Sequence, residues 1–155
     1  MTFDSAAVST LFDKAQSHAM ALGLFETVHS HEPKSAPGNG LRAALWVQDI
    51  RPVGAASGQA ATSGVVTLYV RVYSSFLQHP FDEIDPNLLS ATTTLLGAYT
   101  GDLDLGATVR NIDLLGMYGA AMSAQAGYIN QDNKVYRIMT VTLPVVINDL
   151  WAQGS

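Results

Sequence analysis

The stretch 64-GVVTLYVRVYSSF-76 decides the fold class, because its side chains alternate between two kinds along its length. One set is apolar throughout and consists of Val66, Leu68, Val70, Val72 and Phe76. The other set is mixed and consists of Val65, Thr67, Tyr69, Arg71 and Tyr73. A period of two residues is that of a β-strand whose faces meet different surroundings. The pattern therefore predicts a strand with the apolar set in the core.

The mixed face of this strand is a candidate contact surface. It places Tyr69 and Tyr73 around Arg71, and aromatic residues with arginine are enriched at protein interfaces. The alternative is that these tyrosines only pair with neighbours across the strands of a solvent-facing sheet. Tyr69, Arg71 and Tyr73 are the predicted interface residues of this strand.

One helix is predicted before this strand in the sequence and a second helix after it. Residues 4–22 carry apolar side chains at helical spacing, with Asp4 or Ser5 as the N-cap and Gly23 after the end. Residues 85–101 begin with an Asp-Pro pair, which suits an N-cap and the first helical position, and end in glycine. Each helix has one apolar side to bury against the sheet.

The remaining strands complete a sheet. The segments 24-LFETVHSH-31 and 41-LRAALWVQDI-50 predict a hairpin with a long projecting connection. The segment 107-ATVRNIDLL-115 predicts a further strand.

The C-terminal segment, residues 126–151, predicts a second hairpin that turns at Gln131 to Lys134. Pro144 interrupts its last strand. Because proline lacks the N–H that a sheet ladder needs, we expect that strand to lie at an edge or to contain a bulge.

The chain is predicted to be one α+β domain over residues 1–155, with a mixed, mostly antiparallel sheet and two helices packed on one face. No repeat, low-complexity block or linker divides the sequence. A domain of this length buries roughly 68 to 70% of the surface that its unfolded chain exposes.

The charge balance argues against a nucleic-acid-binding protein. The chain has 8 Lys and Arg against 13 Asp and Glu, a net charge of −5, and its basic residues are scattered. Charged residues make up only 14% of the chain, whereas soluble domains average roughly 25%. So little charge indicates a surface that meets other protein. The alternative is a well-buried monomer with a surface of uncharged polar residues.

The chain contains no cysteine, which excludes disulfides, thiolate zinc sites and cysteine nucleophiles. No apolar run approaches the roughly 20 residues that a membrane helix needs. The N-terminal residues lack the basic start of a signal peptide. We therefore expect a cytoplasmic protein that does not contact a membrane.

The loop 31-HEPKSAPGNG-40 is not a phosphate-binding loop. Phosphate cradles need glycines that lead into a helix, with a Lys and Ser or Thr behind them, and here the glycines lead into a predicted strand. A metal site built on His29 and His31 would need further ligands that the pattern does not bring close. The loop therefore carries no predicted chemistry.

The segment 101-GDLDLGATVRNID-113 has aspartates at the first, third and twelfth positions of a calcium loop, counted from Asp102. It lacks the fifth ligand, the central glycine and the final glutamate of such a loop. No nucleophile elbow, His-Glu-x-x-His motif or catalytic triad can be assembled. The sequence predicts neither a metal nor a cofactor, and no enzyme activity.

Four stretches together carry a resemblance to a known family: HEPKSAPGNGLRAALWVQDIRPV, IDPNLLSA, GDLDLGATVRNIDLLG and SAQAGYINQDNKVYRIMTVTLPVVINDLW. With these, roughly residues 24 to 152 resemble the tail terminator proteins of long-tailed phages of actinobacteria. The resemblance implies a structural virion protein at the junction of tail and neck, assembled in the host cytoplasm. The family has no catalytic residues to carry over.

The resemblance further implies a homo-hexameric ring that caps the tail tube, ends its polymerisation and joins the tail to the head. The implied partners are other copies of the chain, the major tail tube protein and the head-tail connector or stopper. DNA would pass through the ring without sequence-specific binding. The loops 31–40 and 54–63 become candidate arms that reach a neighbouring subunit or the tube, with Lys34, Asn39 and Gln59 as contact residues.

Two alternatives remain open at this point. The first keeps the virion setting and makes the chain a connector or stopper of the neck. The second is a small cytoplasmic ligand-binding domain or an enzyme whose site the sequence does not reveal.

Overall fold

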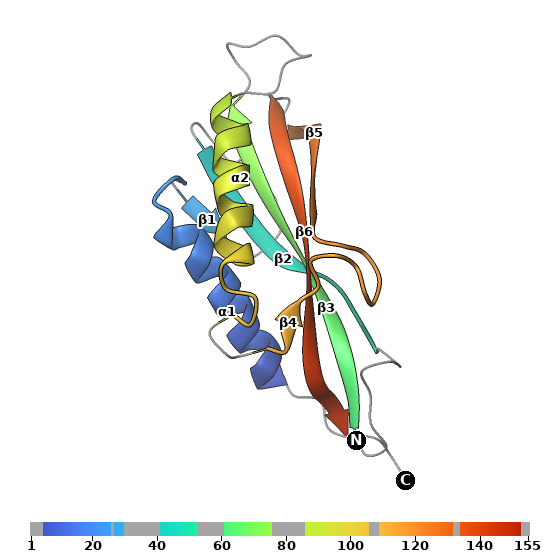
Figure 1. The fold of residues 1–155 in the computed structure, drawn as a ribbon. Helices are drawn as coiled ribbons and strands as arrows, with labels where there is room; N and C mark the ends of the chain where they lie inside the picture. The colour runs from blue at the N-terminus through green and yellow to red at the C-terminus, as the bar shows by residue number, and fades with distance from the viewer. Residues whose placement is uncertain are drawn as a thin grey trace.

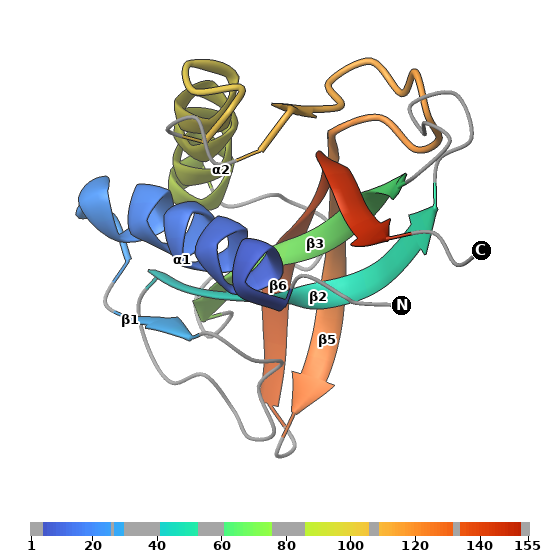
Figure 2. The same ribbon diagram turned by 90° about the horizontal axis from the view of Figure 1, so that it is seen from below.

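The computed structural model describes residues 5–25, 27–29, 41–52, 61–75, 86–105, 109–131 and 134–152. It consists of a layer of two helices against one face of a six-stranded sheet (Figure 1). The sheet is strongly twisted, so that its strands fan out when the molecule is turned by 90° (Figure 2). The predicted α+β class, with a mixed, mostly antiparallel sheet and both helices on one face, is confirmed.

Both helices form where the periodicity predicts them. Helix α1 spans Ser5–Ala21, and Gly23 follows it with a positive φ of 66°. Its buried side chains recur every fourth residue at Leu11, Ala15 and Ala19. Helix α2 spans Pro86–Thr100, so the proline occupies the first helical position as expected.

Helix α2 contains the run Thr92 to Thr94, which is unfavourable in helices because β-branched side chains lose rotamer freedom there. Each threonine hydroxyl donates to the carbonyl four residues earlier, at 2.8 to 2.9 Å. These bonds satisfy the hydroxyls within the helix, including the buried one of Thr92. The run is therefore compatible with a helix that packs Leu88, Leu95 and Tyr99 into the core.

Three long strands form the centre of the sheet. They are β2 (Leu41–Pro52), β3 (Ala61–Ser75) and β6 (Lys134–Ala152), and both pairings of β3 are antiparallel. The other edge of β6 pairs with β5 (Ser123–Gln131) and, further along, with β4 (Asn111–Ile112). The predicted hairpin is confirmed, since Gln131 lies opposite Lys134. The strand predicted over 107–115 is reduced to the two residues of β4.

The predicted hairpin between residues 24–31 and 41–50 is wrong. Strand β1 (Thr27–His29) pairs with β2 in parallel, with Val28 opposite Ala43. A hairpin would make the pair antiparallel, whereas a parallel pair requires the chain to return to the same end of the sheet before it enters the second strand. The two segments are neighbours, but their relative direction was mispredicted.

The predicted edge or bulge at Pro144 is also wrong, because Pro144 lies within the central strand β6 opposite Thr67 of β3, where the register of the pair is continuous. Its carbonyl accepts the N–H of Asp113, on the side of β6 away from β3. The N and C=O of one strand residue point to the same side, so the N–H that proline lacks would also face away from β3. It would fall between Thr142, the last partner of β5, and Val145, the first partner of β4. Proline therefore removes no bond between β3 and β6.

The main core lies between the helices and the sheet. The predicted core residues Val66, Leu68, Val70 and Val72 of β3 are buried there against both helices and β6. A smaller apolar cluster on the other face contains Ala44, Tyr73, Tyr136 and Ile138. The sheet is thus packed on both faces at one end, and its helix-free face is only partly open.

Candidate assembly surfaces

The partly open, helix-free face carries a group of four half-buried side chains, here called the aromatic-arginine patch: Trp46, Tyr69, Arg71 and Thr140. Strand register brings them together, since Trp46 lies opposite Tyr69 and Thr140 lies opposite Arg71. The rings of Trp46 and Tyr69 meet edge to face, with their centroids 6.1 Å apart. These three strands therefore hold large side chains in one fixed arrangement.

Arg71 is the centre of the patch. Its guanidinium carbon lies 5.2 Å from the centroid of the Trp46 ring, and its Nε donates to the hydroxyl of Thr140 at 3.1 Å. A stacked and hydrogen-bonded arginine is held in one conformation, so less side-chain entropy is lost when a partner binds. Trp, Tyr and Arg are the residue types that most often dominate binding energy at interfaces.

The predicted interface residues differ in their exposure and in the cluster to which they belong. Tyr69 and Arg71 belong to the aromatic-arginine patch, whereas Tyr73 is 1% exposed and belongs to the smaller apolar cluster. The predicted contact residues Lys34, Asn39 and Gln59 lie outside the described residues. Val65 and Thr67 of the same strand face are also buried.

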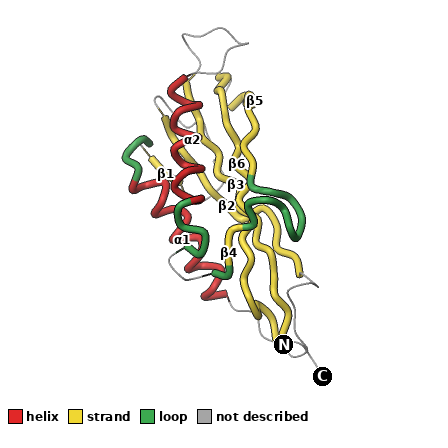
Figure 3. Tube along the Cα trace, viewed as in Figure 1, coloured by secondary structure: helices red, strands yellow, loops and turns green. Residues whose placement is uncertain are grey.

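The burial of Val65 is explained by a segment that sequence reasoning did not single out, residues 113–122. In Figures 1 and 3 this segment, the 113–122 loop, projects beside the sheet on the side away from the helices. Tyr118 packs against Val65 and Val146, which closes that end of the helix-free face. The aromatic-arginine patch therefore lies between the loop and the smaller apolar cluster.

Asp113 anchors the 113–122 loop. The residue is 2% exposed, and its two carboxylate oxygens accept the backbone N–H groups of Met117 and Tyr118 at 2.8 and 3.0 Å. The loop closes where the N–H of Met122 donates to the carbonyl of Leu114 at 3.2 Å. A carboxylate that accepts backbone N–H groups makes charge-assisted bonds, which are stronger than neutral ones.

Two glycines allow this course of the chain. Gly116 has a φ of 78°, in the left-handed region that favours glycine. At Gly119 a Cβ would lie against the guanidinium of Arg51 at the end of β2. The pair Gly116 and Gly119 inside an apolar segment is the sequence signal for a structured loop.

The 113–122 loop presents apolar side chains to the surroundings. Leu115 is 88% and Met117 is 79% exposed, more than the other large hydrophobic residues of the described chain. Single exposed apolar residues are common, but two on one anchored loop make this loop a candidate contact surface.

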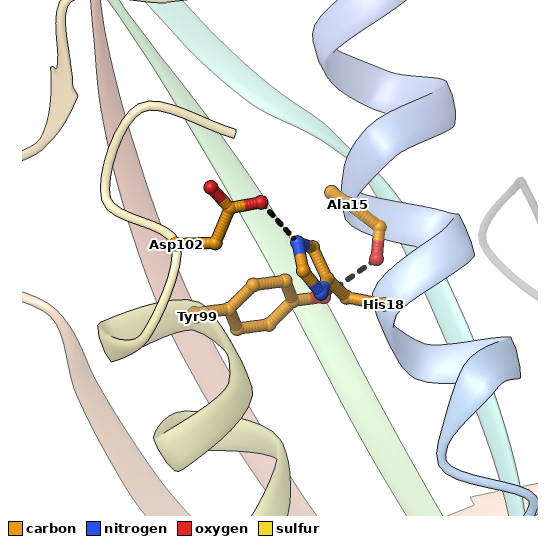
Figure 4. Close-up of polar contacts among 4 residues, drawn as sticks. All are labelled: Ala15, His18, Tyr99 and Asp102. Atoms are coloured by element: carbon orange, nitrogen blue, oxygen red, sulfur yellow. Dashed lines mark hydrogen bonds and ion pairs between the residues drawn. The ribbon is translucent and has the colours of Figure 1, made fainter. Parts of the chain in front are cut away.

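Polar contacts join α1 to the end of α2 and to the turn that follows it (Figure 4). Nε2 of His18 lies 2.8 Å from a carboxylate oxygen of Asp102, and the His18 ring meets the Tyr99 ring edge to face at 5.7 Å. The Tyr99 hydroxyl donates to the carbonyl of Ala15 at 2.9 Å. Burial raises the pKa of Tyr99 well above its usual value. The phenol is thus a neutral, fully buried link from α2 to α1, and the contact supports helix packing.

The aspartates of the apparent calcium loop are used in other contacts. Asp102 bonds to His18, and Asp113 bonds to the 113–122 loop. Among the residues that the structure describes, no three His, Asp or Glu side chains are grouped as a metal site would need. None of the described helices has the length and apolar character to cross a membrane.

The described residues form a two-layer α+β fold with half-buried aromatic side chains and exposed apolar side chains on its surface. No protein-family model matches the chain, and no curated protein matches it. A chain in the virion of a native gene transfer agent particle aligns with 92% of this chain and 98% of its own length, at 14% identity and a TM-score of 0.53. A chain from the sheath/tube terminator of an extracellular contractile injection system aligns with 100% of this chain and 60% of its own length, at 13% identity and a TM-score of 0.37. The first likeness shows that this chain shares its fold with a virion component.

Proposed function

We propose that this chain is a structural virion protein that forms a ring on the end of a phage tail tube, ends the polymerisation of the tube and joins the tail to the head connector. The observation that carries the proposal is the shared fold with a chain of a gene transfer agent virion, which extends over nearly the whole length of both chains. The sequence resemblance to tail terminators of actinobacterial phages supports the finer assignment. In this proposal residues 1–155 act as one domain, and the chain has no catalytic role.

The surface chemistry suits a subunit of an assembly. A cyclic ring needs two different contact patches on each subunit, since each copy binds its neighbours head to tail. The chain has the aromatic-arginine patch and the projecting 113–122 loop, and only 14% of its residues are charged. These features supply contact area that costs little desolvation of charge.

The proposed partners are further copies of the chain, the tail tube protein and the connector or stopper of the neck. Tyr69 and Arg71 are proposed to contact a neighbouring copy or another tail protein, and the loops around Lys34, Asn39 and Gln59 are proposed as arms toward a neighbouring subunit or the tube. DNA passes through the ring without sequence-specific recognition, which the net charge of −5 supports because phosphates are repelled.

The test is the solution mass of the purified protein, measured by light scattering across a concentration series with and without its tube protein. A sixfold mass, alone or on tubes, supports the proposal. A monomer that ignores tubes contradicts it, and binding to the connector without binding to tube ends assigns the chain to the neck instead.

A second experiment tests the arms. A variant that lacks residues 35–39 is expected to fold, as judged by circular dichroism, and to leave tube ends uncapped. Normal capping by this variant would remove the 31–40 loop from the contact surface.

A further inference from the structure

Strand β5 has β6 on one side, and the structure describes no strand on its other side, here called the β5 edge. The hydrogen bonds of β6 show which groups face this edge. The carbonyls of Pro144 and Val146 accept N–H groups from the chain around β4, so the even-numbered residues of β6 point toward β4 and β5. The β5 residues opposite them bond to β6, and the residues between, such as Ala124 and Ala126, point their N–H and C=O groups to the β5 edge.

The sequence of β5 contains none of the features that commonly prevent another strand from adding to an edge. Its nine residues include no charged side chain and no proline, and they pair with β6 without a bulge. Proteins protect exposed strand edges with charges, prolines and bulges, because a bare edge is a template for another strand. A row of backbone N–H and C=O groups is matched by an extended backbone, so the chemistry of the β5 edge selects a β-strand.

The helix layer indicates which strand fits. Ala126 lies opposite Met139 of the main core, so Ala126 and Tyr128 face the helix side of the sheet. Both are exposed, Tyr128 by 45%. In Figures 1 and 2 the two helices lie toward β1 and away from β5. A strand that brings its own helix would cover these side chains, whereas a strand alone would leave them in water.

The other end of the same sheet provides a strand with a helix beside it. Strand β1 is the last strand at that end, and α1 leads into it through Met20 and Leu24, which are 61% and 41% exposed. Strand β1 is parallel to β2, and each later pairing up to β5 is antiparallel, so β1 and β5 run in opposite directions. Rotation about an axis along the strands keeps these directions, and β5 of one copy then meets β1 of the next as an antiparallel pair.

We infer that β5 of one copy pairs with β1 of the next copy, so that the sheet continues from subunit to subunit. The end of α1 in the next copy then covers Ala126 and Tyr128. Repetition of this heterologous contact closes a ring. A twofold pairing of β5 with β5 would use the same backbone groups, but it would leave Tyr128 of both copies uncovered and stop at a dimer. The inference rests on the proposed function and names the strands that join the ring subunits.

Because the chain has no cysteine, engineered cysteines report both the pairing and its faces. His29 lies opposite Ala44 on the helix-free side of the sheet. Four double variants combine His29→Cys with a cysteine on the same side of β5: Ser123→Cys, Gln125→Cys, Gly127→Cys or Ile129→Cys. Opposite residues of an antiparallel pair have Cα atoms about 4.5–5.5 Å apart, which suits a disulfide. Mild oxidation is expected to give a ladder of covalent dimers, trimers and larger species in at least one variant.

The matched controls combine His29→Cys with Ala126→Cys or Tyr128→Cys, which lie on the opposite side of β5. They are expected to give no ladder, and each single variant is expected to remain uncrosslinked. Equal ladders from both sides of β5 would overturn the inference, because strand pairing separates the two sides. Covalent dimers from Gln125→Cys alone would mean that β5 pairs with β5, which also overturns it.

A second measurement separates this inference from the proposed function. Ala126→Pro removes an N–H that points away from β6, so the bonds between β5 and β6 remain while the β5 edge is blocked. Circular dichroism is expected to show an unchanged fold, and light scattering is expected to show self-association weakened at least about tenfold.

Ala126→Lys keeps every backbone group and places a charge where α1 of the next copy would lie, so it should weaken self-association in the same way. Its matched control, Gln125→Lys, places the charge on the helix-free side and should have little effect. Unchanged self-association in both Ala126 variants, or rings without any cross-link, overturn the inference and leave the proposed function standing. A wild-type chain that assembles neither alone nor on tubes overturns both.

Discussion

Asp113→Ala removes the carboxylate that holds the 113–122 loop and leaves the exposed side chains of the loop unchanged. The substitution deprives the N–H groups of Met117 and Tyr118 of their acceptors, which lie at 2.8 and 3.0 Å. It also empties a site that is 2% exposed in the folded chain. We expect the loop to lose its fixed position while the sheet and helices remain.

The size of the stability loss in Asp113→Ala follows from the two hydrogen bonds that the carboxylate accepts. A hydrogen bond to a charged group contributes about 1.5–3 kcal/mol, and water replaces part of this where the amides reach the surface, so the free energy of unfolding should fall by about 2–4 kcal/mol. For a chain of this size the midpoint of thermal unfolding should fall by roughly 5 to 15 °C. Asp113→Asn retains one acceptor oxygen and should lose about half as much.

Urea unfolding measures the free energy, and amide hydrogen exchange measured by NMR reports the loop itself. Exchange at Met117 and Tyr118 should become much faster in Asp113→Ala. The matched control is Asp104→Ala, which removes an exposed carboxylate and should change the free energy by less than about 0.5 kcal/mol. Unchanged protection of both amides in Asp113→Ala would refute the anchoring role.

Three further outcomes are expected. Gly119→Ala should destabilise the folded chain because its φ of 155° is one that L side chains rarely adopt, and because its Cβ also meets the Arg51 guanidinium. Since that guanidinium is the far end of a flexible side chain, adding Arg51→Ala should restore only a small part of the loss in urea unfolding, and full restoration would show that the backbone conformation contributes nothing. The unfolding free energy should fall as pH rises above about 10, because the unfolded chain ionises its tyrosines while buried Tyr99 stays protonated, and Tyr99→Phe should make this fall less steep in alkaline urea titrations. Arg71→Lys keeps the charge but loses the planar contact with Trp46, so it should cost about 1 kcal/mol of stability in urea unfolding, and an unchanged midpoint would show that the contact contributes nothing to folding.

The local structure of this chain was largely predictable. Apolar spacing in the first twenty-two residues gave the position of α1, and the Asp-Pro start at residue 85 located the beginning of α2. Alternation in 64–76 predicted both the β3 strand and its core-facing side chains. These signals work because backbone periodicity and the burial of one face are written in neighbouring residues.

Strand neighbours were less predictable. The direction of β1 against β2, and the place of Pro144 inside a central strand, depend on which segments meet across the sheet. Beside Pro144, the neighbour of β6 changes from β5 to β4. This change depends on where two separate segments of the chain pair along β6. No local pattern in the sequence contains that information.

The candidate surfaces were also predictable only in part. The sequence alone determined the kinds of side chain available: tyrosines around Arg71, very few charges and no cysteine. Only the tertiary structure decided that Tyr73 is buried while Tyr69 and Arg71 remain half-exposed beside Trp46, and that Asp113 anchors a loop bearing Leu115 and Met117. The physical reason is that exposure and hydrogen-bond partners are set by packing between distant segments, whereas composition and periodicity describe each segment by itself.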